Sequence, residues 1–225
     1  MINTDIIDSY EISIFPTYVN QFFLEKTPLF EQMTDRFIEI KHKKIHYGSH
    51  DNDVDTYCTK DTLHEIEEFT ELTKIIKTCF DISLDRLDIK HQGANITAMW
   101  TNIHGNKNGG FHDLHLHANS YLSCVLYVNV PEGAGNILFE DPRERRNTVV
   151  WDSKYSNDNY EKYRSWEFSP KTAMLIVFPS YLRHKVRRGK YNDDEHRIVI
   201  SANCIPNAEC NEITLRYKYS NGIAV

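Results

Sequence analysis

The sequence of 225 residues lacks a long hydrophobic run and lacks a basic leader. No apolar stretch approaches the roughly 20 residues that a membrane-spanning helix needs. The first residues, MINTDIIDSYEIS, carry acids where a secretory signal carries bases. We therefore expect an intracellular, cytoplasmic protein that makes no membrane contact.

Paired cysteines and a basic charge excess are also missing. The five cysteines are odd in number, scattered and without a CxxC pair, which predicts free thiols: Cys58, Cys79, Cys124, Cys204 and Cys210. Lys and Arg number 26 against 32 Asp and Glu, giving a net charge of -6 that argues against duplex nucleic acid as a partner. No Walker loop or GxSxG elbow is present, which removes the commonest nucleotide and hydrolase chemistries.

Glycine and proline are scarce, at 9 and 7 residues, which excludes collagen-like and low-complexity chains. Hydrophobic residues make up 40% of the sequence, enough for a globular core. We expect one domain over residues 1–225, with supporting elements in 1–83 and a β-core in 84–218.

The N-terminal part reads as a short strand followed by helices. Alternation over Tyr10 to Tyr18 predicts a strand ending at Pro16, because proline cannot donate to a sheet ladder. Apolar residues spaced three or four apart predict a helix over 28–40, and the polar stretch 41–60 reads as a loop. A capping box at Thr62-x-x-Glu65 predicts the start of a second helix that runs to Cys79.

After residue 83 the pattern changes to short segments rich in β-branched and aromatic residues, separated by Gly, Pro, Asn or Asp. These predict strands, and the polar stretch 152–162 predicts a loop between two of them. Helices followed by strands, without alternating βαβ units, indicate an α+β and mainly β fold whose helices pack outside an antiparallel sandwich or barrel. The predicted strands are ANITAMWTN, YLSCVLYVNV, NILFE, NTVVW, TAMLIVFP and RIVISANC.

The strongest local signal is a cluster of histidines. Residues 112–117 read HDLHLH, and His184 follows the predicted strand TAMLIVFP. On an extended strand Asp113, His115 and His117 would project to one side and His112 to the other. Neutral imidazoles are ligands for Fe, Zn, Cu or Ni, and a His-x-His pair with a distant third ligand leaves coordination positions open. The alternative is that these histidines decorate a polar strand edge.

The segment after His184 favours the metal interpretation. Arg197 begins the next predicted strand, and its planar guanidinium can bind a carboxylate through two parallel hydrogen bonds, which a lysine cannot reproduce. A metal beside an inward arginine suits a ligand that chelates the metal at one end and carries a carboxylate at the other. 2-Oxoglutarate has that shape.

The ordered set W-x-N (Trp100, Asn102), H-x-H-x-x-S (residues 115–120), SCVLYVN, GAGNILFEDPR, FPSYLRH and HRIVISAN resembles the 2-oxoglutarate and Fe(II)-dependent oxygenases. Within that superfamily it is most similar to a small group common in marine bacteria and their phages. The resemblance spans most of the chain and is strongest from Thr97 to Asn203. It implies a double-stranded β-helix, the jelly-roll or cupin-like barrel, with the metal inside its open mouth. A phage-encoded chain would act in the host cytoplasm.

By this resemblance, His115 and His184 correspond to the first and last ligands of the superfamily's H-x-D/E…H triad. His117 stands where most members have Asp or Glu, so the implied site has three histidines unless Asp113 or water supplies an oxygen ligand. A neutral ligand in place of an anion leaves the metal about one charge more positive, which changes its hydration, potential and oxygen reactivity. The small group itself carries H-x-H, so the departure does not imply inactivity.

The resemblance also implies a cosubstrate site. Arg197 corresponds to the residue that binds the distal carboxylate of 2-oxoglutarate, and Tyr127 to a tyrosine that hydrogen-bonds the same carboxylate in prolyl-hydroxylase-like members. Ser201 lies four residues after Arg197 on the same strand face, and Asn102 and Asn203 are weaker candidates. Packing inside the sheet is the alternative interpretation for Tyr127 and Ser201, whereas asparagine is disfavoured in strands and so has a polar reason to be at 102 and 203.

Two other features have structural interpretations. The basic run 183–190 reads as a solvated edge that discourages strand pairing, or alternatively as a docking patch for an acidic substrate. The three tryptophans, Trp100, Trp151 and Trp166, are expected to fill the barrel.

The resulting hypothesis is an Fe(II)- and 2-oxoglutarate-dependent dioxygenase that hydroxylates a peptide or small molecule and releases succinate and CO2. Its expected partners are 2-oxoglutarate, O2 and that substrate, and a homodimer is allowed. The alternatives are a three-histidine cupin-type metalloenzyme that does not use 2-oxoglutarate, and a non-catalytic jelly-roll binding or structural protein. An Arg197 outside the barrel would favour the first alternative, and a filled barrel mouth the second.

Overall fold

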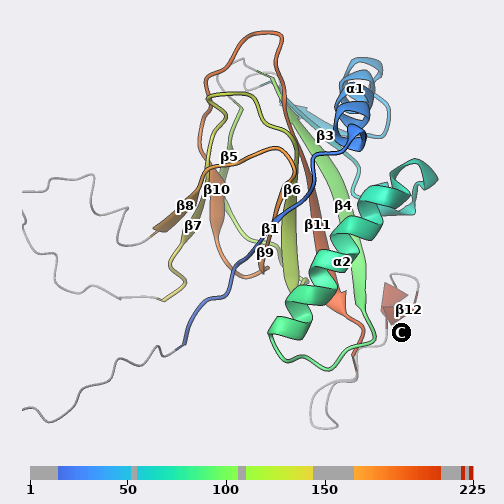
Figure 1. Ribbon diagram of the computed structural model, residues 1–225, viewed down its shortest axis with the longest axis vertical. Coiled ribbons are helices and arrows are strands. Elements are labelled where there is room, and N and C mark those ends of the chain that lie inside the picture. Colours follow the sequence, from blue (N-terminus) through green and yellow to red (C-terminus); the bar gives the residue numbers. More distant parts are fainter. Residues whose placement is uncertain are drawn as a thin grey trace, which may run out of the picture.

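The computed structural model describes residues 15–51, 55–105, 110–143 and 165–208, together with the short strands β12 (Tyr219–Ser220) and β13 (Ile223–Ala224). Two helices and two antiparallel sheets make up most of these residues (Figure 1). No helix in this part of the chain is both long and apolar enough to span a membrane.

The larger sheet has seven strands in the order β1-β9-β6-β11-β4-β3-β2, and every neighbouring pair is antiparallel. The longest ladder joins β11 to β4 and pairs Arg197 with His104 at one end and Pro206 with Ala94 at the other. The strands are β1 (Asn20–Phe23), β2 (Tyr47–Asp51), β3 (Thr56–Thr59), β4 (Ala94–His104), β6 (Leu122–Asn129), β9 (Met174–Pro179) and β11 (Arg197–Pro206).

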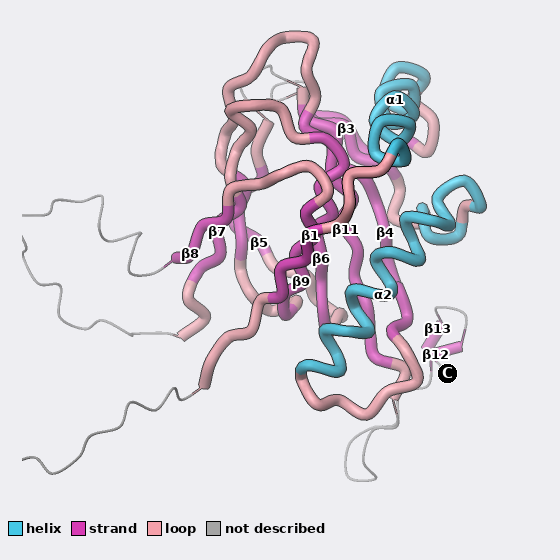
Figure 2. The backbone as a smooth tube through the Cα atoms, viewed as in Figure 1, coloured by secondary structure: helices cyan, strands magenta, loops and turns pink. Residues whose placement is uncertain are grey.

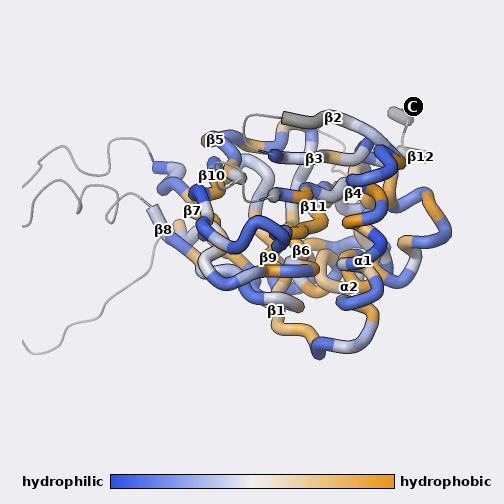
Figure 3. The backbone as a smooth tube through the Cα atoms, turned by 90° about the horizontal axis from the view of Figure 1, so that it is seen from above, coloured by the Kyte–Doolittle hydropathy of each residue, from blue (hydrophilic) through white to orange (hydrophobic). Residues whose placement is uncertain are grey.

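The smaller sheet has four antiparallel strands in the order β5-β10-β7-β8. It lies opposite the larger sheet, and the helices lie on the far side of the larger sheet (Figures 2 and 3). This arrangement is the double-stranded β-helix with helices outside, as the sequence predicted. The strands are β5 (His112–His115), β7 (Ile137–Glu140), β8 (Ser165–Phe168) and β10 (His184–Val186).

Alternation along the central strands separates two cores. In β6 and β11 the even-numbered residues, such as Leu126 and Ile200, belong to the core under the helices. Odd-numbered residues, such as Val125, Tyr127 and Val199, face the smaller sheet, where they pack with residues such as Phe139. Because side chains alternate across a strand, each central strand supplies both cores at once.

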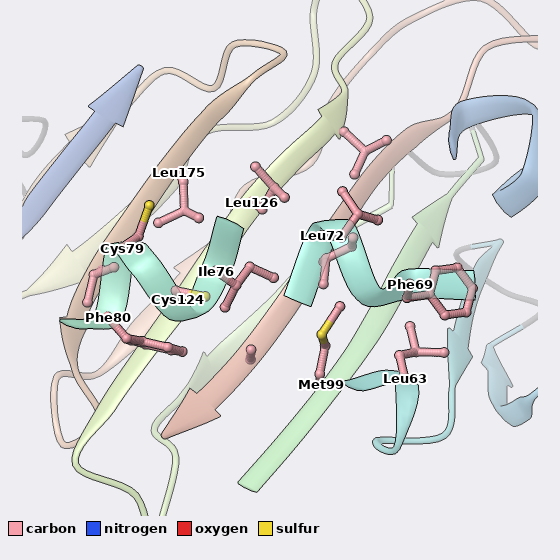
Figure 4. Close-up of a cluster of buried hydrophobic side chains, with 14 of the residues drawn as sticks. Leu63, Phe69, Leu72, Ile76, Cys79, Phe80, Met99, Cys124, Leu126 and Leu175 are labelled. Carbon is pink, nitrogen blue, oxygen red and sulfur yellow. The ribbon is translucent and has the colours of Figure 1, made fainter. Parts of the chain in front are cut away.

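Helices α1 (Pro28–Lys43) and α2 (Thr70–Arg86) cover the outer face of the larger sheet. Pro28 begins α1, where its missing N–H costs no hydrogen bond, and the predicted helix at 28–40 is therefore confirmed. Along α2 the buried residues recur three or four positions apart and point at β4, β6 and β9 (Figure 4). They are Leu72, Ile76, Cys79, Phe80, Ser83 and Leu84.

Two N-terminal predictions are wrong. The stretch 41–60 is not a loop, because it contains β2 and β3, whose buried Tyr57 donates a hydrogen bond to the carbonyl of Ile45. The capping box does not start an α-helix either. Thr62 makes no capping hydrogen bond, and two short 3₁₀ turns, Leu63–Glu65 and Glu67–Phe69, precede α2. Tertiary pairing and packing override the local signal in both places.

The basic run 183–190 is not a free edge. Its first part forms β10, which pairs with β5 on one side and β7 on the other. Arg183 Nη1 lies 3.0 Å from Glu140 Oε2, and Arg187 Nε lies 3.0 Å from Glu167 Oε1. Acids of the neighbouring strands therefore balance part of the charge of the basic run. The expectation that Trp166 fills the barrel is also wrong, because this side chain lies on β8 and is 69% exposed.

Several predicted elements fall partly or wholly outside the described residues. These are the strand at 10–16, whose described Phe15 and Pro16 are not in a strand, the strand NTVVW, the loop 152–162, Trp151 and Cys210. The other four cysteines are free, as expected.

Candidate active site

A cavity of about 70 Å³ lies between the two sheets. A single water needs roughly 10–15 Å³ on the same scale, so several atoms of a ligand fit. No acidic residue is among the described residues that line it. The polar and aromatic side chains in its wall are Trp100, Asn102, His112, His115, His117, Phe178, His184, Arg197 and Ser201.

Three of the histidines form a compact group. The candidate ligand nitrogens of His115, His117 and His184 all lie within 4.8 Å of one another. His115 ends β5, His184 begins β10, and the two residues are directly paired in the β5–β10 ladder. His117 follows β5, and its backbone N–H donates to the carbonyl of Ser180 at 3.0 Å, which fixes this turn against the segment that leads to His184.

Hydrogen bonds orient two of these rings. The Nδ1 of His115 lies 2.7 Å from the carbonyl of Asp113, and the Nδ1 of His184 lies 3.0 Å from the carbonyl of Leu182. A carbonyl oxygen only accepts, so each Nδ1 carries the proton and each Nε2 keeps its lone pair. Both rings therefore use the same device, a bond to the carbonyl two residues earlier. Metal-binding histidines are commonly held in this way.

Burial keeps two of these imidazoles neutral. It lowers the pKa of His184 to about 3, with nearby His115 as the next cause, and it lowers the pKa of His117 to about 4 for the same two reasons. Burial disfavours the protonated, charged rings, so their nitrogens keep lone pairs that can be donated to a metal cation. The donor set thus fits a divalent transition metal.

Aromatic side chains hold the histidine rings in place. Phe178 of β9 packs against His184 with ring centres 4.7 Å apart, and Phe139 of β7 lies 5.7 Å from the same ring. On the other side, Trp100 of β4 lies 5.6 Å from His117. These walls limit the motion of the imidazoles and exclude water from part of the site.

Arg197 occupies the first position of β11 and is only 1% exposed. Its Nε and Nη1 atoms have no hydrogen-bond partner in the described part of the chain. Its pKa is lowered by burial, but an arginine side chain stays charged in proteins. A buried cation without a counter-ion is costly, so this guanidinium suits an anionic ligand in the cavity.

Of the other predicted cosubstrate residues, Tyr127 lies beside Arg197. Tyr127 is fully buried, its ring centre lies 5.4 Å from the guanidinium carbon, and its hydroxyl also has no partner among the described residues. Burial raises the pKa of Tyr127 to about 12, so its hydroxyl is a proton donor. Asn102 and Ser201 line the cavity and bond weakly to each other at 3.4 Å. Asn203 bonds to buried Ser123 instead, at 2.8 Å.

His112 is the residue that sequence alternation misplaced. Between the pairs His184–His115 and Val186–His112, β5 advances three residues while β10 advances two. This bulge turns His112 to the cavity side, whereas simple alternation predicted that it would point to the opposite side from His115 and His117. Asp113, proposed as a fallback ligand, is exposed and is not part of the three-histidine group.

Comparison with known protein families decides the affiliation. Residues 98–203, which carry the three histidines and Arg197, match the family described as "Putative 2OG-Fe(II) oxygenase". This part of the chain, which forms the candidate site, is therefore assigned to the 2OG-Fe(II) oxygenase superfamily. A search of curated proteins finds no match.

Solved structures of 2OG-Fe(II) oxygenases share the fold at low sequence identity. A prolyl-4-hydroxylase from Pseudomonas putida aligns with a TM-score of 0.56 and 12% identity, covering 83% of this chain and 92% of that one. HygX from Streptomyces hygroscopicus, solved with nickel and 2-oxoglutarate, aligns with a TM-score of 0.52 and 11% identity, covering 86% of this chain and 84% of that one. The carbocyclase SnoK from nogalamycin biosynthesis aligns with a TM-score of 0.60 and 12% identity, covering 84% of this chain and 79% of that one. Since these proteins differ in reaction, the shared fold leaves the reaction and substrate of this oxygenase open.

Proposed function

We propose that this oxygenase binds Fe(II) through His115, His117 and His184 and binds 2-oxoglutarate through Arg197. We further propose that it hydroxylates a peptide or small molecule, with release of succinate and CO2. The observation that carries the proposal is that one cavity holds two groups that each lack a partner among the described residues. They are three converging imidazoles and a buried guanidinium without a counter-ion.

Each group has a role that follows from its chemistry. Bound iron would supply the oxygen and electron-transfer chemistry, which no side chain here can perform. The imidazoles hold the metal and leave positions open for ligands, because three ligands do not fill its coordination sphere. Arg197 fixes the distal carboxylate, which orients the 2-oxo acid end of the cosubstrate toward the histidines. Trp100, Phe139 and Phe178 keep water from part of the reaction site.

The two alternatives are less well supported. A three-histidine metalloenzyme that does not use 2-oxoglutarate has no need for Arg197, which is buried and lines the cavity. A non-catalytic jelly roll has no need for an open cavity beside three converging histidines. A peptide or small-molecule substrate accords with the net charge of -6, which disfavours nucleic acid.

The test is an anaerobic titration of the Fe(II)-loaded protein with 2-oxoglutarate, followed by visible absorption. Chelation of Fe(II) by a 2-oxo acid produces a metal-to-ligand charge-transfer band, and we expect that band to saturate at one equivalent. Succinate should then form when oxygen is admitted. A protein that binds iron but shows neither the band nor succinate would contradict the proposal and favour the alternative without 2-oxoglutarate.

A further inference from the structure

His112 is a fourth imidazole in the cavity wall, and its Nε2 is buried without a hydrogen-bond partner in the described residues. It is not in the metal-binding group, whose members are His115, His117 and His184. The ring centre of His112 lies 6.1 Å from that of His115. The β5 bulge that turns this ring inward therefore creates a polar group whose purpose the metal site does not explain.

The surroundings of His112 point to the arginine side of the cavity. Its ring packs edge-on against His104, with ring centres 4.9 Å apart. His104 is the ladder partner of Arg197, so both side chains emerge on the same face of the larger sheet. Gly110 lets the chain pass close to His104, because a Cβ there would collide with the imidazole. This contact positions the start of β5, so that His112 lines the same cavity as Arg197.

Several buried polar atoms on and near Arg197 share one property. His112 Nε2, Tyr127 Oη and the Nε and Nη1 atoms of Arg197 are all buried and all lack a partner in the described part of the chain. Each can donate a hydrogen bond, provided that His112 carries its proton on Nε2. Leaving a buried donor without an acceptor is energetically unfavourable. A cluster of such donors around a positive charge, with no acid among the described residues of the cavity wall, is complementary to a carboxylate.

We propose that His112 is a second binding residue for the distal carboxylate of 2-oxoglutarate, donating from Nε2 to the carboxylate that Arg197 also binds. This inference rests on the proposed function and adds a contact to it. The imidazole makes the carboxylate site stiffer than a single arginine would, because its ring is wedged between His104 and the cavity. Burial is the main cause that lowers the pKa of His112 to about 4, and the nearby His115 and Arg197 lower it further. The ring is therefore neutral near pH 7.

The experiment measures binding of 2-oxoglutarate to the Mn(II)-loaded protein by anaerobic titration calorimetry. His112→Phe keeps a ring and removes the donor, whereas His112→Gln keeps an N–H donor at a similar reach. His64→Phe is the matched control, because His64 also has a buried unpartnered nitrogen but lies on the 3₁₀ turn Leu63–Glu65, away from the cavity. Oxalate serves as the comparison ligand, because it chelates the metal but has no distal carboxylate.

We expect His112→Phe to weaken 2-oxoglutarate binding about 10- to 100-fold, the usual effect of losing a hydrogen bond to a charged group. Oxalate binding and Mn(II) stoichiometry should not change, His112→Gln should recover most of the loss, and His64→Phe should match the wild type. Unchanged 2-oxoglutarate affinity in His112→Phe would overturn this inference alone, as would an equal loss for oxalate. A wild-type protein that binds metal but not 2-oxoglutarate would overturn the proposed function together with it.

Discussion

His115 and His184 are direct partners across the β5–β10 ladder, and their ring centres lie 4.3 Å apart. Each donates its Nδ1 proton to the carbonyl two residues earlier in its own segment. Two segments far apart in sequence therefore present the same tautomer to the same point. The pair prepares two ligand atoms before any metal arrives, which lowers the ordering cost of binding.

His184→Ala should abolish Fe(II) binding, because it removes one of three ligand atoms and opens the site to water. We expect the loss of affinity to exceed the roughly 10- to 100-fold effect of removing a supporting hydrogen bond. Metal content per protein after equilibrium dialysis measures it. His42→Ala, at an exposed position in the last turn of α1, is the control and should retain iron.

Arg197→Ala should separate the two halves of the site. Iron binding should persist, whereas the concentration of 2-oxoglutarate needed for half-saturation should rise by about 100-fold or more, as expected when a charge-assisted bidentate contact is lost. Equal loss of iron in Arg197→Ala and His184→Ala would show that the two residues do not have separate roles.

Tyr127→Phe should affect the free and the bound protein differently. The buried hydroxyl has no partner among the described residues, so its removal should leave the unfolding free energy of the ligand-free protein unchanged or raise it by about 1 kcal/mol. Binding of 2-oxoglutarate should weaken about tenfold. Urea unfolding and calorimetry measure the two effects. A stability loss above about 1 kcal/mol would mean that the hydroxyl already has a partner in the free protein.

Stability of the metal-free protein should fall as the pH drops from about 6.5 toward 4. The pKa values of His112 and His117 are lowered to about 4 and that of His184 to about 3, all chiefly by burial. An unfolded histidine titrates near 6.5, so in this range the unfolded chain binds protons that the folded chain does not. Each such histidine then lowers the free energy of unfolding by up to about 1.4 kcal/mol for each pH unit of the drop.

Urea unfolding at about pH 7, 6 and 5 in the presence of a chelator measures this dependence. His112→Phe should make the slope shallower by the contribution of one histidine, since phenylalanine does not titrate. An unchanged slope would show that His112 takes up its proton equally in both states.

Phe80→Ala should destabilise the fold by about 3–5 kcal/mol, because Phe80 is fully buried between α2 and the larger sheet. Ile82→Ala on the same helix is the control, because Ile82 is 37% exposed and its loss should cost much less. The metal stoichiometry of folded Phe80→Ala should match the wild type, since the helices lie on the outer face of the larger sheet. Loss of metal at full folding would contradict this separation.

The sequence by itself determined the elements whose signals are local. Apolar spacing predicted α1, and hydrophobic runs predicted β4, β6, β7, β9 and β11, because burial on one or both faces imposes a period on the chain. The order of motifs, from H-x-H through Arg197, indicated the superfamily and the double-stranded β-helix. The choice of His115, His117, His184 and Arg197 as candidates also came from the sequence, since few other functions require those residue types in that order.

Only the tertiary structure decided which side chains meet. Strands β2 and β3 have polar sequences that no local pattern marks as strands. They form because β3 pairs with β4 and β2 pairs with β3. The position of His112 depends on a bulge, which shifts the alternation by one residue and has no fixed sequence pattern that would predict it. The missing partners of Arg197 and Tyr127 are likewise properties of burial, and burial is set by residues that are distant in the chain and adjacent in the fold.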